Sequence, residues 1–147
     1  MTFADALGIR VESADEQRVE AVMPITPEVL QPFGFVHGGA TIALLETAAS
    51  IGAELRANLD EERPFGVDVH VRHRKSGRAG TLRGVAELDR EEPSRAAGMK
   101  QFWRVAAYDD AGDVVSEGEV VTKIVSLDYL ARKNRERATA KELPLSS

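Results

Sequence analysis

Apolar and polar residues alternate along most of this chain, and one long segment departs from the alternation. Period-two alternation is typical of strands with one buried face, and five segments show it: residues 18–25, 65–74, 80–89, 100–109 and 114–125. The connections between them are too short for parallel crossovers, so we expect an antiparallel sheet. Residues 27–39 and 90–98 read as loops, because proline and glycine interrupt them.

The exception runs from about Gly39 to Asn58 and has the pattern of a helix. Its apolar residues point in nearly every direction around the axis, which is typical of a buried helix. An antiparallel sheet of five or six strands has to curl around such a helix to cover it. We therefore predict an α+β fold with one long buried central helix inside a curled sheet. This domain spans residues 1–126, and a basic helix with a flexible tail follows at residues 127–147.

The composition narrows the class of protein. The 147 residues include no cysteine, which excludes disulfides, thiolate nucleophiles and cysteine-ligated metals. A formal net charge of -5 argues against general nucleic-acid binding, because that affinity depends on accumulated lysine and arginine. MTFADALGIR at the start lacks the features of a signal peptide, and no apolar run approaches the roughly 20 residues that span a bilayer. We expect a cytoplasmic protein.

One basic segment runs against the acidic average. Residues 72–86 contain no acid and five basic residues: Arg72, Arg74, Lys75, Arg78 and Arg83. A solvated strand face followed by a loop would explain them. A binding site for a small polyanion would also explain these basic residues, and the pattern alone leaves both interpretations open.

Glu46 is the only charged residue between His37 and Glu54, within the segment predicted to be buried. Burial of an unpaired carboxylate costs free energy, so a buried glutamate is usually paired, neutralised or functional. The alternative is that one edge of the helix is exposed to solvent and Glu46 lies on it. Ser50 lies one turn further on, so a carboxylate and a hydroxyl share one face and can hold a water molecule between them.

The sequence His37-Gly38-Gly39 stands directly before this helix. Glycines permit close backbone approach, and the free N–H groups of a helix start suit an oxygen that becomes anionic. Gly38 and Glu46 are about 12 Å apart along a helix, too far to act on the same atom from one helix. If the two cooperate, Glu46 must come from a second subunit, and a two-fold dimer would carry two equivalent sites.

The stretch MPITPEVLQPFGFVHGGATIALLETAAS resembles the hotdog-fold acyl-CoA thioesterases, in the branch of the phenylacetate-pathway, 4-hydroxybenzoyl-CoA and 1,4-dihydroxy-2-naphthoyl-CoA enzymes. The resemblance continues through VDVHVRHRKSGRAGTLRG and QFWRVAAYDDAGDVVSEGEVVTKIV, and covers roughly residues 8–125. Its most specific features are QPFG, HGG and a glutamate nine residues after the histidine. The QPFG and VRHR segments are closest in form to the dihydroxynaphthoyl and 4-hydroxybenzoyl enzymes.

The resemblance implies a role for each matching residue. Glu46 is the expected catalytic carboxylate, either as a general base on water or as a nucleophile at the thioester carbon, and Ser50 helps to place the water. Gly38 is expected to donate its backbone N–H to the thioester carbonyl, with Gln31 and His37 assisting or orienting.

Substrate contacts are expected from Gly39 and from His73, which matches a histidine of the dihydroxynaphthoyl type. Strand alternation independently places His73 on one face with Val67, Val69 and Val71, where a histidine at the edge of the core is the alternative. The phosphates of coenzyme A are expected to meet the basic segment, at Arg72, Arg74, Lys75 and Arg78.

The chain departs from these relatives in two places. His70 stands where an asparagine is usual, which leaves any inherited contact at this position open. The basic extension LARKNRERATAK follows the last strand. It can cover the adenosine end of the site, pack on a neighbouring subunit or have no role.

Other chemistries fit less well. His70 and His73 form an H-x-x-H pair, but residues three apart in a strand face opposite sides, which argues against one metal ion held by both. There is no G-x-S-x-G for a serine hydrolase. Two alternatives on the same scaffold stay open: an acyl-thioester dehydratase or hydratase, and a non-catalytic acyl-CoA-binding sensor.

We therefore predict an acyl-CoA thioesterase that hydrolyses an aromatic (hydroxynaphthoyl- or hydroxybenzoyl-like) or medium-sized acyl-CoA. Neither a metal nor a cofactor is expected, since coenzyme A is part of the substrate. The expected partners are acyl-CoA and further copies of the chain, in a homotetramer built as a dimer of dimers with sites shared between subunits. Neither nucleic acid nor membrane is an expected partner.

Overall fold

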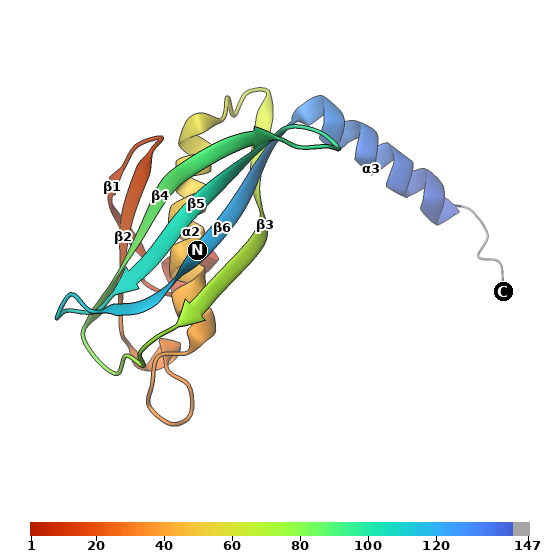
Figure 1. The fold of residues 1–147 in the computed structure, drawn as a ribbon. Helices are drawn as coiled ribbons and strands as arrows, with labels where there is room; N and C mark the ends of the chain where they lie inside the picture. Colours follow the sequence, from red (N-terminus) through yellow and green to blue (C-terminus); the bar gives the residue numbers. More distant parts are fainter. Residues whose placement is uncertain (143–147) are drawn as a thin grey trace.

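A computed structural model describes residues 1–142 and contains six strands, three α-helices and one 3-10 turn (Figure 1). The strands are β1 (Arg10–Ala14), β2 (Arg18–Pro24), β3 (Glu62–His73), β4 (Thr81–Pro93), β5 (Met99–Tyr108) and β6 (Val114–Ser126). The helical segments are α1 (Phe3–Ala6), the 3-10 turn η1 (Pro27–Val29), α2 (Gly38–Arg56) and α3 (Leu127–Glu142). The tail expected to be flexible lies largely outside the described residues.

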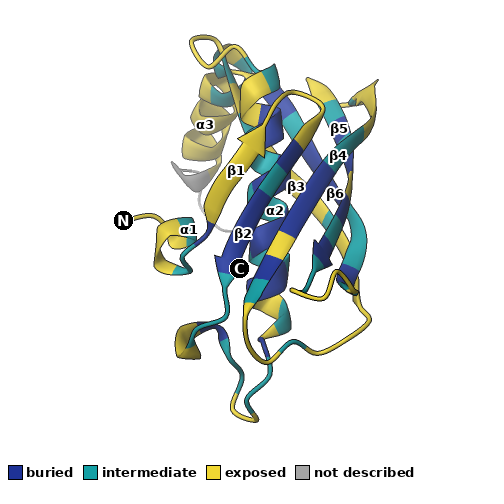
Figure 2. Ribbon diagram, turned by 90° about the vertical axis from the view of Figure 1, so that its left-hand side faces the viewer, coloured by how far each residue is buried: buried dark blue, intermediate teal, exposed yellow. Residues whose placement is uncertain are grey.

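The six strands form one antiparallel sheet in the order β1-β2-β4-β5-β6-β3. The helix α2 lies along one side of this sheet and contacts every strand (Figure 1). Figure 2 shows that buried residues concentrate where α2 and the sheet face each other. The α+β fold with a long central helix and a curled sheet is confirmed.

Glycine permits close contact between α2 and the sheet at two core positions. Trp103 of β5 is fully buried and lies against Gly52 of α2, where a Cβ would overlap the indole ring. Gly84 of β4 faces Leu44 of α2, whose Cγ would lie 2.8 Å from a Cβ at that position. At each contact, one layer contributes a large side chain and the other contributes a glycine, so the helix and the sheet lie close together.

A chain of buried polar groups holds Trp103 in place. Its Nε1–H donates to Thr122 Oγ1 at 2.9 Å, the Thr122 hydroxyl donates to Gln101 Oε1 at 2.9 Å, and Gln101 Nε2 donates to Glu91 at 2.8 Å. The guanidinium of Arg56, in the last turn of α2, bonds to Glu91 at 3.1 Å and lowers the pKa of that carboxyl below its ordinary value. The end of α2 is thus tied to β4 and β5.

The structure adds one strand that the sequence did not predict and shortens one predicted loop. The strand β1 was not predicted, and all five of its residues are exposed. Hydrophobic alternation reflects burial of one face, which this edge strand lacks. The loop expected at residues 90–98 is shorter than predicted, because β4 continues to Pro93 and β5 begins at Met99. Within residues 1–142, no helix is both long enough and apolar enough to cross a membrane.

Gly52→Ala tests the close contact between α2 and Trp103. In an unconstrained helix, alanine in place of glycine would raise the free energy of unfolding. Here we expect a decrease of about 1–3 kcal/mol, the usual cost of overpacking, because its hydrogen bond keeps the indole from withdrawing. Urea denaturation measures the change, with Glu54→Ala on the exposed face of α2 as the control. A more stable Gly52→Ala protein would contradict this packing.

Candidate active site

The helix α2 begins at Gly38, with His37 as its N-cap. His37 Nδ1 accepts the N–H of Gly39 at 2.9 Å, so that donor is already engaged, and contact of Gly39 with substrate stays a prediction. Among the residues that the structure describes, the N–H of Gly38 has no acceptor. One backbone donor at the positive end of a 19-residue helix is therefore free to bind an anionic oxygen.

His73, the last residue of β3, lies against this helix start. Its Nδ1 is hydrogen-bonded at 2.7 Å to the Oγ of Ser116, a fully buried residue of β6. Its Nε2 faces Gly38, since a Cβ at position 38 would lie 2.7 Å from that nitrogen. Because Ser116 engages Nδ1, Nε2 is the ring atom left to bond a ligand. Gly38 and His73 form one half of the candidate site.

Glu46 forms the other half, at the margin between β3 and the face of α2 that the sheet leaves open. Its half-buried carboxylate lines a pocket of about 280 Å³. The lining residues come from α1 and α2: Phe3, Ala43, Glu46, Thr47, Ser50, Ile51 and Glu54. The structure thus brings Glu46 and Ser50 together, as predicted from their spacing. Among the side chains of residues 1–140, none forms a hydrogen bond or ion pair with the Glu46 carboxylate.

Gly66 of β3 lets the Glu46 side chain lie against the sheet. A Cβ at position 66 would overlap Glu46 Oε1. A β-bulge lies between Gly66 and Asp68, and this extra residue turns both Gly66 and Val69 toward α2, although positions three apart in a regular strand face opposite sides. The predicted place of Val67 on the core face is wrong, because the bulge leaves its side chain 49% exposed.

The two halves do not meet within one chain, because eight residues of α2 separate Gly38 from Glu46, about 12 Å along the axis. Both halves nevertheless lie beside the same strand, since Gly38 contacts His73 and Glu46 contacts Gly66, both in β3. β3 is the last strand of the sheet, and its outer edge has no strand partner among the described residues. An open edge therefore lies next to both halves.

Gln31 shapes the loop that precedes α2. Its N–H donates to the carbonyl of Phe35 at 2.8 Å, and its side-chain oxygen accepts the N–H of Phe33. A bridge between Leu30 and Val36 closes the same loop. The side-chain oxygen of Gln31 is therefore used within the loop, and contact of its amide nitrogen with substrate stays a prediction.

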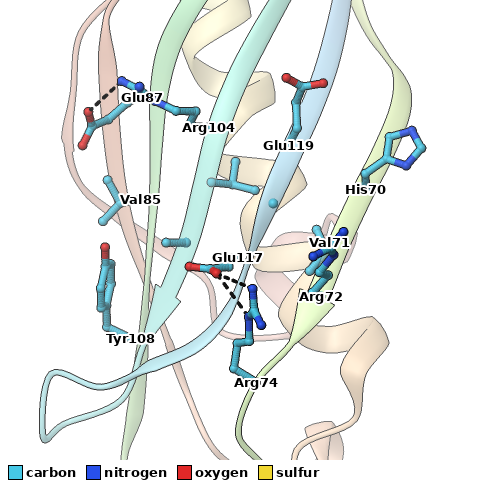
Figure 3. A pocket seen from close by; sticks show the side chains of 13 residues that line it. His70, Val71, Arg72, Arg74, Val85, Glu87, Arg104, Tyr108, Glu117 and Glu119 are labelled. Atoms are coloured by element: carbon cyan, nitrogen blue, oxygen red, sulfur yellow. Dashed lines mark hydrogen bonds and ion pairs between the residues drawn. The ribbon is translucent and has the colours of Figure 1, made fainter.

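The four basic residues assigned to the phosphates are not gathered at Glu46. Arg72 and Arg74 line a broad pocket of about 840 Å³ on the outer face of the sheet, opposite α2 (Figure 3). Arg74 is paired there with Glu117 at 2.9 Å. His70 lines this outer pocket too, so the strand places it opposite to His73, as the alternation predicts.

The other two basic residues belong to the connection between β3 and β4. Lys75 bonds to Asp109 at 2.7 Å and to Asp113 at 2.9 Å, and these carboxylates raise its pKa. Arg78 lies over the ring of Phe35, 4.9 Å from its centroid, next to the loop before α2. Local carboxylates therefore offset the charges of Arg74 and Lys75, and a role of the four residues toward phosphate stays a prediction.

Sequence reasoning missed Ser116 and Gly66, which position His73 and Glu46. Ser116 lies opposite His73 in the pairing of β3 with β6, so the signal is a register that a single sequence does not reveal. Gly66 carried a signal, because an isolated glycine in a strand pattern often marks a bulge or a close approach.

Comparison with known proteins places this geometry in a family context. The sequence pattern of the thioesterase superfamily matches residues 33–116. The chain is 30% identical over 119 residues to a 1,4-dihydroxy-2-naphthoyl-CoA hydrolase of Escherichia coli, across 81% of this chain and 83% of that one. It is 32% identical over 111 residues to the proofreading thioesterase EntH of Cronobacter turicensis, across 76% and 77%. A mutant of thioesterase PA1618 of Pseudomonas aeruginosa has a similar solved structure, with a TM-score of 0.77 at 27% identity over 86% of this chain and 87% of that one.

Ser116→Ala tests the hydrogen bond that fixes the His73 ring. Loss of the hydroxyl should lower the free energy of unfolding by about 1 kcal/mol and change the tautomer balance of the imidazole. Imidazole ¹⁵N NMR measures the second effect directly, and Ser94→Ala in the loop between β4 and β5 is the control. Identical His73 nitrogen shifts in Ser116→Ala and the parent protein would contradict the bond.

Proposed function

The chain belongs to the thioesterase superfamily, and we propose on that basis that it hydrolyses an acyl-CoA with an aromatic or medium-sized acyl group to the free acid and coenzyme A. The observation that carries the proposal is the Glu46 carboxylate. It lies half-buried beside Ser50 in a pocket, and no side chain of residues 1–140 is bonded to it. A carboxylate kept free of internal partners is available to an incoming water or thioester.

Glu46 acts in one of two ways. As a general base, it takes a proton from water while the water oxygen bonds to the thioester carbon. As a nucleophile, it bonds to that carbon itself, and water then cleaves the resulting anhydride. In both routes the carbon–sulfur bond breaks, and the sulfur leaves as the thiolate of coenzyme A and takes up a proton.

The anionic oxygen of the intermediate needs a donor, and the free N–H of Gly38 supplies it. Because Gly38 of the same chain is too distant, the donor comes from a second copy paired along the open edge of β3. A two-fold axis through that edge directs the helix start of each copy toward the Glu46 pocket of the other. Assembly of two such dimers into a tetramer stays a prediction, as does the cytoplasmic location.

An aromatic acyl group is proposed for two reasons. The Escherichia coli relative is named as a dihydroxynaphthoyl-CoA hydrolase. The loop before α2 also carries Phe33, which is 80% exposed. Exposed aromatic side chains of this kind suit a flat ring, whereas Trp103 is fully buried in the core.

Glu46→Ala should reduce kcat about a thousandfold or more, because it removes the group that activates water or attacks the thioester. Thiol release from hydroxynaphthoyl-CoA, 4-hydroxybenzoyl-CoA, phenylacetyl-CoA and straight-chain acyl-CoAs is the measurement. The matched control is Glu54→Gln, because Glu54 lines the same pocket two turns further along α2. This variant is expected to retain activity within about threefold. A folded Glu46→Ala protein with most of its activity would refute the assignment. Tight coenzyme A binding without turnover of any substrate would favour the sensor.

The shared site is tested by mixing two inactive proteins, Glu46→Ala and Gly38→Pro. Proline fits the first position of a helix and removes the N–H, but it also adds a Cβ beside His73. Gly38→Ala adds the same Cβ and keeps the N–H, so it controls for this crowding. Random pairing after joint refolding should restore about a quarter of the parent activity, since half of the dimers then carry one complete site. Failure of the mixture to recover activity, with both parents folded and dimeric, would exclude a shared site.

A further inference from the structure

The helix α3 projects from the body of the protein. It follows β6 directly and extends past the β3 edge, on the side of the sheet where α2 lies (Figures 1 and 2). Its base is anchored, because the Leu127 N–H donates to the carbonyl of Glu61 at 2.8 Å and Ser126 Oγ caps the N–H of Tyr129 at 3.0 Å. Residues 131–140 are all exposed, so the rest of the helix rests on nothing in its own chain.

The charge of α3 is opposite to that of the body. Residues 1–126 contain 14 basic and 21 acidic residues, whereas α3 carries five basic residues in ten positions: Arg132, Lys133, Arg135, Arg137 and Lys141. Lys133 is paired with Glu136 at 3.5 Å. Within the described residues, no carboxylate pairs with Arg132, Arg135 or Arg137. An acidic body therefore carries an extended cationic arm, defined as residues 131–142.

The Glu46 pocket needs such an arm if its substrate is an acyl-CoA. Glu46 and Glu54 are the charged residues of its lining, so the pocket itself offers no cation to the phosphates of coenzyme A. Arg74 and Lys75 are offset by local carboxylates, and Arg72 lies on the opposite face of the sheet. Of the four basic residues expected at the phosphates, this leaves Arg78, which lies over Phe35 beside the loop before α2, as one cation against the three unpaired arginines of the arm.

We propose that the cationic arm binds the adenosine 3′-phosphate and diphosphate end of the substrate, across the β3 edge where two copies meet. The inference rests on the proposed function and on pairing through β3. A copy paired at that edge would continue the sheet beneath the arm, so the arm would lie over the junction at which Glu46 of one copy meets the helix start of the other. Arginine guanidinium groups bind phosphate oxygens in pairs of hydrogen bonds.

The test compares two substrates in the full chain and in the triple variant Arg132→Gln, Arg135→Gln, Arg137→Gln, which keeps good helix formers in α3. One substrate is an acyl-CoA, and the other is the same acyl group on pantetheine, which lacks the nucleotide phosphates. In the variant, KM for the acyl-CoA should rise about tenfold or more at unchanged kcat, while KM for the acyl-pantetheine stays the same. Added salt should raise KM for the acyl-CoA in the parent protein and less in the variant.

A matched control removes the same charge elsewhere, with Arg10→Gln, Arg83→Gln and Arg104→Gln, all exposed residues of β1, β4 and β5. If the control raises KM for the acyl-CoA as much as the arm variant does, the effect is one of net charge and the proposal fails. Equal KM for acyl-CoA in the arm variant and the parent also overturns it. A variant that loses its oligomeric state by light scattering would show that α3 is a subunit contact instead.

The experiments distinguish an error in the proposal for the cationic arm from an error in the proposed function. Turnover of acyl-pantetheine that depends on Glu46 supports the hydrolase whatever the arm does. If no thioester is turned over, titration calorimetry with coenzyme A still tests the arm, because the triple variant should weaken binding about tenfold. Equal binding by both proteins would overturn the arm on its own.

Discussion

Close approach between α2 and the sheet is the constraint on which the rest of this structure depends. A helix can fill a curled sheet only if the two layers interlock, and here they do so through glycine. Trp103 of the sheet lies against Gly52 of the helix, and Leu44 of the helix lies against Gly84 of the sheet. Because protein cores are packed about as densely as organic crystals, each pair limits both the depth and the rotation of α2 against the sheet.

Glycine contacts between α2 and the sheet also position the residues of the candidate site. Gly38 of the helix receives His73 of the sheet, and Gly66 of the sheet receives Glu46 of the helix. Along α2, the glycine contacts of the core alternate with the glycine contacts of the candidate site. The positions of the site residues therefore follow from the packing of the core. A change that shifts α2 by the width of one methyl group therefore moves the Glu46 carboxylate and the free N–H of Gly38 together.

The sequence predicted well what depends on burial and on local pattern. The all-round apolar helix, the strands with one buried face and the isolated charge of Glu46 all follow from the cost of placing the wrong group in an apolar core. The sequence-based predictions were wrong or incomplete where the position of a side chain depends on strand register or on pairing with another strand. An exposed edge strand has no alternation, a bulge reverses the face of Val67, and the ion pair of Arg74 depends on a residue of another strand.

The open edge of β3 has a consequence for how the protein survives in a crowded cell. Alternate residues of the 12-residue strand β3 direct unpaired backbone groups to its open edge, and such edges are templates for aggregation. Whatever polypeptide covers β3 removes that hazard and, in doing so, changes what stands beside His73 and Glu46. Protection from aggregation and the surroundings of the candidate site therefore depend on the same surface.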